Sequence, residues 1–446
     1  MPQFTFIHAA DLHLGAPFKG LDAAAPSAFS SPGRKANLLA EAGFTALERL
    51  EAACKEHDAA FLILAGDIYD DKDGVLRARF ALRDMFLRLR DMGVRVFIAH
   101  GNHDPLRPGS LPVAWPENVT VFGKTVSSEH VVRDGLPLAL VRGVSHETAR
   151  ETENLALHFA LPAPEQESSP SLSDALSPDL FQIAVLHCAV GGAGDNHAPY
   201  APCSLSDLTE TETDYWALGH VHQGKILCEA PFVVYPGSIQ GLHINETGRH
   251  GCCVVRVDGK TCTVNTLPLA PVVWKKLPVA VEEAQETIDA LEEKLVETLE
   301  ASAMECIGAD AVFCRIILEG ATPLDAELRR PGGLETLLDR LRKEPALYND
   351  SVKVWVKDIR LATSPPINFA LLAEREDLMG EVVRMATSMH ATPVKAEEMA
   401  AHATAPLYGN SKVKKALTGA DPAEFCPSVL ANEAKSLLCS LLEGGE

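Results

Sequence analysis

Short apolar segments recur through the first half of the chain, and glycine, acidic residues or histidine follow most of them. Unbroken apolar runs of this length are typical of strands buried on both faces of a sheet. We expect such strands at residues 4–9, 61–65, 94–99, 139–144, 183–186 and 215–218. Residues 37–57 and 75–92 carry apolar side chains at spacings of three and four, which predicts amphipathic helices. Alternating strands and helices indicate the α/β class.

The pattern changes after residue 230, where short strands follow one another directly. We expect them at residues 232–235, 251–257 and 261–267, the last two joined at Asp258-Gly259. After Pro268 and Pro271, expected strands at 272–277, 311–318 and 352–361 alternate with expected helices at 281–301 and 333–343. Segments 23–32 and 161–178 predict loops. We therefore predict a first domain over 1–270, a small α+β domain over 271–362 and a helical region over 363–446.

Composition narrows the function classes. The 446 residues include 40 Lys and Arg against 61 Asp and Glu, a net charge of −21. Because Lys and Arg neutralise phosphates in sequence-independent binding, this balance leaves room only for local contacts with nucleic acid. Eleven cysteines are scattered without a CxxC motif, which predicts reduced and mostly buried thiols. No apolar run approaches the roughly 18 residues of a membrane-spanning helix, so we expect a cytoplasmic protein without a membrane segment.

Residues able to bind metals or transfer protons follow five of the expected strands. These clusters are Asp11 with His13, Gly66 to Asp70, Gly101 to Asp104, His187, and Gly219 to His222. Ligands of α/β sheets bind beyond the carboxyl ends of the strands. We therefore expect the five clusters to meet in space.

The chemistry of these clusters fits two metal ions. Carboxylate, amide and neutral imidazole ligands suit divalent Mn, Fe, Zn or Co, and the lack of cysteine in the clusters argues against a thiolate zinc site. Asp11 and His13 are one residue apart, which places both on one side of an extended segment. His220 and His222 repeat this gap, but a turning chain could offer them to different ions. The carboxylate of Asp67 could bridge ions roughly 3.5–4 Å apart.

The same residues resemble the five-motif signature of calcineurin-like metallophosphoesterases. The matching motifs are Asp11-x-His13, Gly66-Asp67-x-x-Asp70, Gly101-Asn102-His103-Asp104, His187 and Gly219-His220-x-His222. Within that superfamily, residues 7–21, 100–104 and 235–243 resemble the YhaO branch, which is close to the bacterial nuclease subunit SbcD. The resemblance covers about residues 1–265. It implies a four-layer α/β/β/α sandwich followed by a capping domain.

Carried over position by position, the resemblance implies a role for each motif residue. One ion would be held by Asp11, His13, Asp67 and His222, and the other by Asp67, Asn102, His187 and His220. His103 would be a catalytic histidine that binds no metal and helps protonate the leaving oxygen, and Asp104 would orient it. Asp70 would act from outside the ligand set. The implied reaction is hydrolysis of a phosphodiester by a hydroxide that two divalent ions activate, with Mn²⁺ expected first and Fe, Zn, Co or Mg as alternatives.

Three functions stay open on the sequence alone. A DNA exonuclease or endonuclease of SbcD-like type is expected first. A phosphodiesterase or nucleotide pyrophosphatase acting on small molecules is the alternative enzyme. The third is a scaffold subunit of a coiled-coil ATPase with conditional activity.

Partners are expected from the same resemblance. These are DNA as substrate, an SbcC-like coiled-coil ATPase that docks on residues 368–446, and a second copy of the chain. Five arginines lie on the expected helix 75–92, where pairing with nearby acids such as Asp84 and Asp91 is the first interpretation and contact with DNA phosphates the second. They are Arg77, Arg79, Arg83, Arg88 and Arg90.

Overall fold

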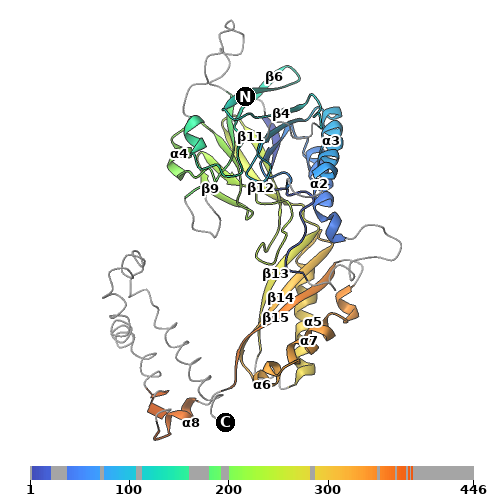
Figure 1. Ribbon diagram of the computed structural model, residues 1–446, viewed down its shortest axis with the longest axis vertical. Helices are drawn as coiled ribbons and strands as arrows, with labels where there is room; N and C mark the ends of the chain where they lie inside the picture. The colour runs from blue at the N-terminus through green and yellow to red at the C-terminus, as the bar shows by residue number, and fades with distance from the viewer. Residues whose placement is uncertain are drawn as a thin grey trace. The chain divides into compact units, whose positions relative to one another are not determined.

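The computed structural model (Figure 1) describes most of the first 384 residues. The described ranges are 3–21, 38–70, 75–106, 113–159, 180–191, 200–281, 287–348, 352–366, 369–377, 380–381 and 383–384. The predicted loops at 23–32 and 161–178 lie outside these residues, as does most of the predicted helical region. One short helix of that region is described, α8 (Phe369–Ala373).

The first sheet contains the strands that the sequence predicts at the start of the chain. Its order is β12-β11-β1-β2-β3-β4. The strands are β1 (Gln3–Ala9), β2 (Phe61–Ala65), β3 (Arg95–Ala99), β4 (Val119–Val121), β11 (Gly251–Asp258) and β12 (Thr261–Pro268). Strands β1 to β4 are parallel, while β11 runs antiparallel to both β1 and β12.

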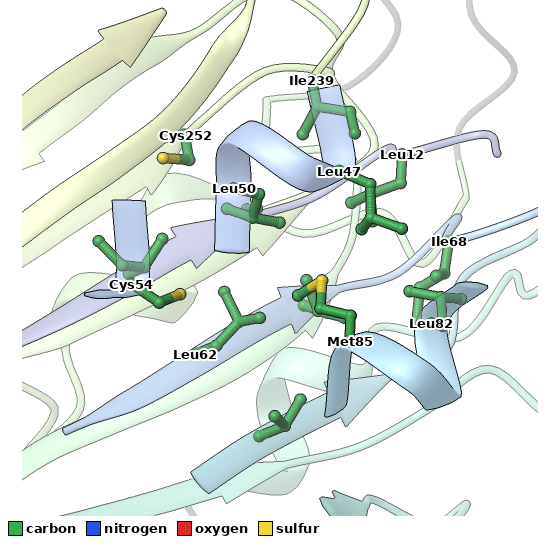
Figure 2. Packing of buried hydrophobic residues seen from close by; sticks show 14 of the residues in the cluster. Leu12, Leu47, Leu50, Cys54, Leu62, Ile68, Leu82, Met85, Ile239 and Cys252 are labelled. Atoms are coloured by element: carbon green, nitrogen blue, oxygen red, sulfur yellow. The ribbon is translucent and has the colours of Figure 1, made fainter. Parts of the chain in front are cut away.

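Two helices cover one face of this sheet, α2 (Leu38–Glu56) and α3 (Val75–Asp91). Leu50 of α2 and Met85 of α3 are buried in the same cluster as Leu62 of β2 (Figure 2). Cys252 of β11 joins this cluster, so the helices contact both the parallel and the antiparallel part of the sheet. Apolar side chains at helical spacing thus determine which helix face is buried.

The second sheet has the order β5-β6-β7-β8-β10-β9. Its strands are β5 (Ser127–Arg133), β6 (Leu136–Gly143), β7 (Phe181–His187), β8 (Tyr215–Gly219), β9 (Lys225–Glu229) and β10 (Phe232–Tyr235). Buried aromatic residues pack between the two sheets: Tyr215 of β8 meets Phe6 of β1 edge-on at 5.2 Å between ring centroids, and Phe6 stacks on Phe61 of the neighbouring strand β2 at 4.9 Å. The outer face carries short elements in the described residues, η1 (Leu155–Phe159) and α4 (Leu205–Thr209).

A third sheet follows, with the order β13-β14-β15. The elements from here on are β13 (Val272–Ala280), α5 (Ile288–Met304), β14 (Ala311–Ala321), α6 (Asp325–Arg329), α7 (Gly333–Leu341), η2 (Pro345–Tyr348) and β15 (Lys353–Ser364). The predicted strand and helix order is confirmed, with β13 extending to Ala280 and α5 described from Ile288 to Met304.

The chain divides into two compact units, and the division cuts all three strands of the third sheet. One unit holds residues 1–276, 298–315 and 344–357, and the other holds 277–297, 316–343 and the residues described from 358 on. The boundary predicted between residues 270 and 271 therefore stays a prediction. The α/β class is confirmed by two mixed sheets with helices on them.

Three strands were absent from the sequence prediction: β4, β5 and β9. Each lies at an edge of its sheet and is only partly buried. An edge strand has a neighbouring strand on one side only, and its side chains are more exposed to solvent. A continuous apolar run is therefore not required in such a strand.

Nine of the cysteines lie in the described residues. All nine are free thiols and seven are buried, as predicted. Within the described residues, no helix combines the length and the apolar character needed to cross a bilayer.

Gly219, at the end of β8, allows the two sheets to approach closely. A Cβ built on it would lie 1.8 Å from the carbonyl oxygen of Ala65 at the end of β2. The overlapping atom is a backbone carbonyl oxygen, so no flexible side chain could move aside to make room for a Cβ. The ends of β2 and β8 therefore meet only because residue 219 lacks a side chain.

We expect Gly219→Ala to lower the free energy of unfolding by about 1–3 kcal/mol, because the added methyl overlaps a backbone carbonyl. Urea unfolding followed by circular dichroism would measure this. Gly123→Ala is the matched control, since a Cβ there meets nothing within 4 Å. Equal unfolding curves for the two variants would contradict the close approach.

Candidate metal centre

All seven predicted metal ligands lie together at the carboxyl ends of β1, β2, β3, β7 and β8. The Asp11 carboxylate accepts a hydrogen bond from the backbone N–H of His220 at 3.0 Å. His187 Nε2 lies 3.1 Å from Asn102 Oδ1, and the His187 and His220 rings are 5.3 Å apart. His13 Nε2 is 3.2 Å from His222 Nε2. The structure thus joins residues that the sequence separates by more than 200 positions.

Asp67 lies between the two halves of the cluster. Its Oδ2 is 3.8 Å from His13 Nε2 and 3.4 Å from His187 Nε2. Its other oxygen accepts a hydrogen bond from the backbone N–H of His103 at 2.8 Å. One oxygen therefore faces imidazoles of both predicted ion sites, which is the geometry that a bridging carboxylate requires. The bridging role itself stays a prediction.

The imidazole nitrogens are arranged for a cation. His13 Nδ1 donates to Asp70 at 3.0 Å, His222 Nδ1 donates to Glu246 at 2.6 Å, and His187 Nδ1 donates to the Ala65 carbonyl at 2.9 Å. With Nδ1 acting as donor, a neutral ring presents a lone pair at Nε2. The lone pairs of His13 and His222 would then face each other at 3.2 Å, which a shared divalent ion would relieve.

The donor set also fits such an ion chemically. The clusters Asp11–His13–His222 and Asp11–Asp67–His187 each place their donor atoms within 4.8 Å of one another. Imidazole nitrogen with carboxylate and amide oxygen suits Mn²⁺, Fe²⁺, Co²⁺ or Zn²⁺. The residues therefore fit a centre of two divalent ions, whichever metal occupies it.

Four of the predicted ligand residues have positive φ angles, which residues other than glycine rarely adopt. The φ values are 51° at Asp11, 41° at His13, 51° at Asp67 and 105° at His220. Neighbouring segments hold this conformation, because Asp11 N–H donates to Gly66 O and His13 N–H donates to Asp67 O, each at 3.0 Å. Such strain persists only where the surroundings impose it, and it concentrates at functional sites.

Burial and charge act against each other on the ionisable ligands. Burial raises the pKa of Asp11 above its usual value, and the nearby histidines reduce this effect. Burial also opposes ionisation of Asp67, but the charge and hydrogen bond of His187 outweigh it and hold the Asp67 pKa well below its usual range. For His187, burial lowers the pKa while Asp67 and Asp11 raise it, with a net value of about 9. The pKa values of His13 and His222 are raised as well, because neighbouring carboxylates outweigh burial.

The predicted orientation of His103 by Asp104 is wrong. Both oxygens of Asp104 accept hydrogen bonds from backbone N–H groups of residues 67, 68 and 101, and one oxygen also accepts from His100 Nδ1 at 3.0 Å. Asp70 instead binds His103, with its Oδ1 at 2.6 Å from His103 Nδ1. Asp104 therefore fixes the strand ends, and Asp70 fixes the imidazole.

Sequence reasoning missed Glu246, which binds His222 from the loop between β10 and β11. For Glu246, burial raises the pKa, but the hydrogen bond and charge of His222 lower it to about 2. The residue follows the last recognisable motif and belongs to no periodic element, so no sequence signal pointed to it. His8 and His100 beside the motifs are buried and hydrogen-bonded within the protein, His8 to Tyr215 and to the Leu218 carbonyl.

The arginines of α3 are largely paired with acids, as the first interpretation expected. Arg88 makes two hydrogen bonds to Glu51, Arg77 pairs with Glu41, and Arg90 pairs with Asp91. The fourth pair joins Arg83 to Asp84 at 3.6 Å. Arg79 is buried and donates to the Tyr69 hydroxyl.

We expect Mn²⁺ affinity to increase between pH 6 and pH 8. The raised pKa of His187, about 9, means that this imidazole is protonated in the metal-free protein over the whole interval. Metal must displace that proton, so affinity should rise by up to about tenfold per pH unit for each proton released. Calorimetry under argon in two buffers of different ionisation enthalpy would count the protons. An affinity independent of pH would contradict the assignment of His187 as a ligand.

We expect Asp70→Asn and Asp104→Asn to have different effects. Asp70→Asn should reduce phosphodiester hydrolysis by about 10–100-fold, because His103 and His13 lose a charged partner. Asp104→Asn should lower the free energy of unfolding by about 1–3 kcal/mol, because three backbone N–H groups lose a charged acceptor. Turnover of a small aryl phosphodiester would measure the effect of each variant on hydrolysis, and urea unfolding would measure its effect on stability. Loss of turnover with unchanged stability in Asp104→Asn would instead favour the prediction that Asp104 orients His103.

Comparison with known proteins places this geometry in a family. Residues 4–224 match the calcineurin-like phosphoesterase family, and residues 274–364 match the middle domain of metallophosphoesterase YhaO. The chain is 33% identical to the uncharacterized metallophosphoesterase YhaO of Bacillus subtilis over 350 residues, which cover 78% of this chain and 79% of the relative.

More distant relatives are two proteins named DNA double-strand break repair protein Mre11. The Archaeoglobus fulgidus protein is 25% identical over 68% of this chain and 65% of its own length. The Aeropyrum pernix protein is 27% identical over 55% of this chain and 56% of its own length. Together with the clustered His and Asp residues, these matches show that the chain belongs to the YhaO family of calcineurin-like metallophosphoesterases, with distant similarity to Mre11 proteins.

Proposed function

We propose that the protein is a metal-dependent nuclease that hydrolyses phosphodiester bonds of DNA. The observation that carries the proposal is the contrast between the ligands and His103. His13, Asp67 and His187 have side chains no more than 5% exposed, whereas the His103 side chain, beside them, is 47% exposed. A substrate could therefore reach His103 next to the metal ligands.

His103 supplies the proton chemistry in this proposal. His103 Nδ1–H donates a hydrogen bond to Asp70. Nε2 is then the atom that could exchange a proton with the substrate. A protonated His103 would donate to the leaving oxygen of the phosphodiester, and Asp70 would hold the imidazole ring in position. Bound ions would supply charge neutralisation at the phosphate and activate a water molecule.

DNA as the substrate is supported by the distant Mre11 relatives, whose names refer to repair of DNA double-strand breaks. The net charge of −21 and the acid-paired arginines of α3 limit DNA binding to local contacts. We propose that an SbcC-like coiled-coil ATPase or a second copy of the chain supplies further contacts. Mn²⁺ is the proposed physiological metal.

The proposal predicts Mn²⁺-dependent cleavage of end-labelled linear DNA by the purified protein. Asp67→Asn should abolish cleavage and Mn²⁺ binding together, because it removes the charge that faces both ion sites. His103→Ala should reduce cleavage by about 10²–10⁴-fold while Mn²⁺ binding persists. His158→Ala is the matched control, since this histidine pairs with Glu153 on the surface.

The same assay separates the alternatives. Turnover of a small aryl phosphodiester with intact single-stranded and double-stranded DNA would overturn the nuclease proposal in favour of a small-molecule phosphodiesterase. Absence of turnover on every substrate, with two ions bound, would favour the scaffold function.

A further inference from the structure

We infer that Glu246 is a positioning residue of the metal centre, which orients His222 and thereby sets the affinity of the ion held by Asp11, His13 and His222. Glu246 lies beyond the segment that matches the phosphoesterase family, residues 4–224. Its Oε1 is 2.6 Å from His222 Nδ1, and its side chain is 11% exposed. The inference concerns metal binding and does not depend on DNA being the substrate.

The carboxylate of Glu246 is held in place by its own loop. Oε2 accepts a hydrogen bond from the Leu242 N–H at 2.5 Å, and the Glu246 N–H donates to the His243 carbonyl at 2.8 Å. His250 Nε2 donates to the Glu246 carbonyl at 3.1 Å. Both oxygens and both backbone groups of Glu246 are therefore occupied, which restricts the carboxylate to one orientation.

The loop is in turn tied to two other segments. Lys19 N–H, after β1, donates to the Leu242 carbonyl at 2.9 Å. Gly248 N–H, two residues beyond Glu246, donates to the Trp274 carbonyl in β13 at 3.1 Å, and Trp274 Nε1 donates to the Gly241 carbonyl at 2.9 Å. The loop thus forms a frame around Glu246 rather than a free surface turn.

This arrangement parallels the one at His13. There Asp70 accepts from His13 Nδ1, while His13 Nε2 faces His222 Nε2. Two carboxylates outside the ligand set thus hold the two imidazoles of one predicted ion site, whereas His187 at the other site donates to a neutral carbonyl. A carboxylate behind a ligand imidazole fixes its tautomer and increases its basicity.

His243 is the competing partner of Glu246. Its Nε2 lies 3.3 Å from the same Oε1, and its side chain is 35% exposed. The contact with His222 is shorter and less exposed, so we assign the carboxylate to His222. His243→Ala should then leave metal affinity unchanged within about threefold.

Glu246→Gln tests the inference in the full-length protein. A glutamine has one acceptor oxygen and cannot accept from both Leu242 N–H and His222 Nδ1–H, while the size of the side chain is kept. Calorimetric titration with Mn²⁺ should show one of the two binding steps weakened by about 10–100-fold and the other changed by less than about threefold.

Glu153→Gln is the matched control, because the carboxylate of Glu153 pairs with His158 at 2.9 Å on the surface rather than with a candidate ligand. Unchanged Mn²⁺ affinity in Glu246→Gln, or an equal loss in Glu153→Gln, would overturn the inference. So would a lowered metal-free melting temperature with intact affinity, which is the result that a purely structural role produces. Failure of the nuclease proposal would appear separately, as intact DNA with wild-type Mn²⁺ binding.

Discussion

The structure depends on the close approach of strand ends from two different sheets. His187 ends β7 of the second sheet, yet its Nδ1 donates to the carbonyl of Ala65, which ends β2 of the first. Gly66 and Gly219 make the approach sterically feasible, because a Cβ on either would overlap His187 or Ala65. Between the sheets, Tyr215 of β8 packs edge-on against Phe6 of β1 in a continuous buried cluster.

Several carboxylates lie at these strand ends, and they make different kinds of contact. Asp11 and Asp67 face the imidazoles directly, while Asp70 and Glu246 hold imidazoles from behind. Asp104 binds backbone N–H groups and fixes the segments that follow β2 and β3. Buried carboxylates are costly unless each is paired or hydrogen-bonded. Here each has such partners, so the cluster is compatible with a folded metal-free protein.

The sequence was sufficient to predict that the candidate ligands lie together and to predict the strands that carry them. Buried strands leave continuous apolar runs, and the residues after them are brought together by sheet topology, so Asp11, Asp67 and His187 could be predicted from position alone. The edge strands β4, β5 and β9 were missed because partial burial leaves a mixed pattern. The roles of Asp104 and Glu246 depend on hydrogen bonds formed between loops, which no periodicity encodes. Substrate identity likewise has no local signature in these residues.

Strand β1 comes first in the chain but lies in the interior of its sheet, between β2 and β11. During synthesis, β1 can pair with β2 early, but its other edge stays open until residues 251–258 of β11 leave the ribosome. Residues 66–250, which number 185, separate β2 from β11 and take roughly 10–40 seconds to synthesise at about 5–20 residues per second. During that interval an apolar strand edge is exposed, and the candidate ligands that follow β7 and β8 are synthesised only near its end. During translation, the unpaired edge of β1 is therefore a site where another chain could pair.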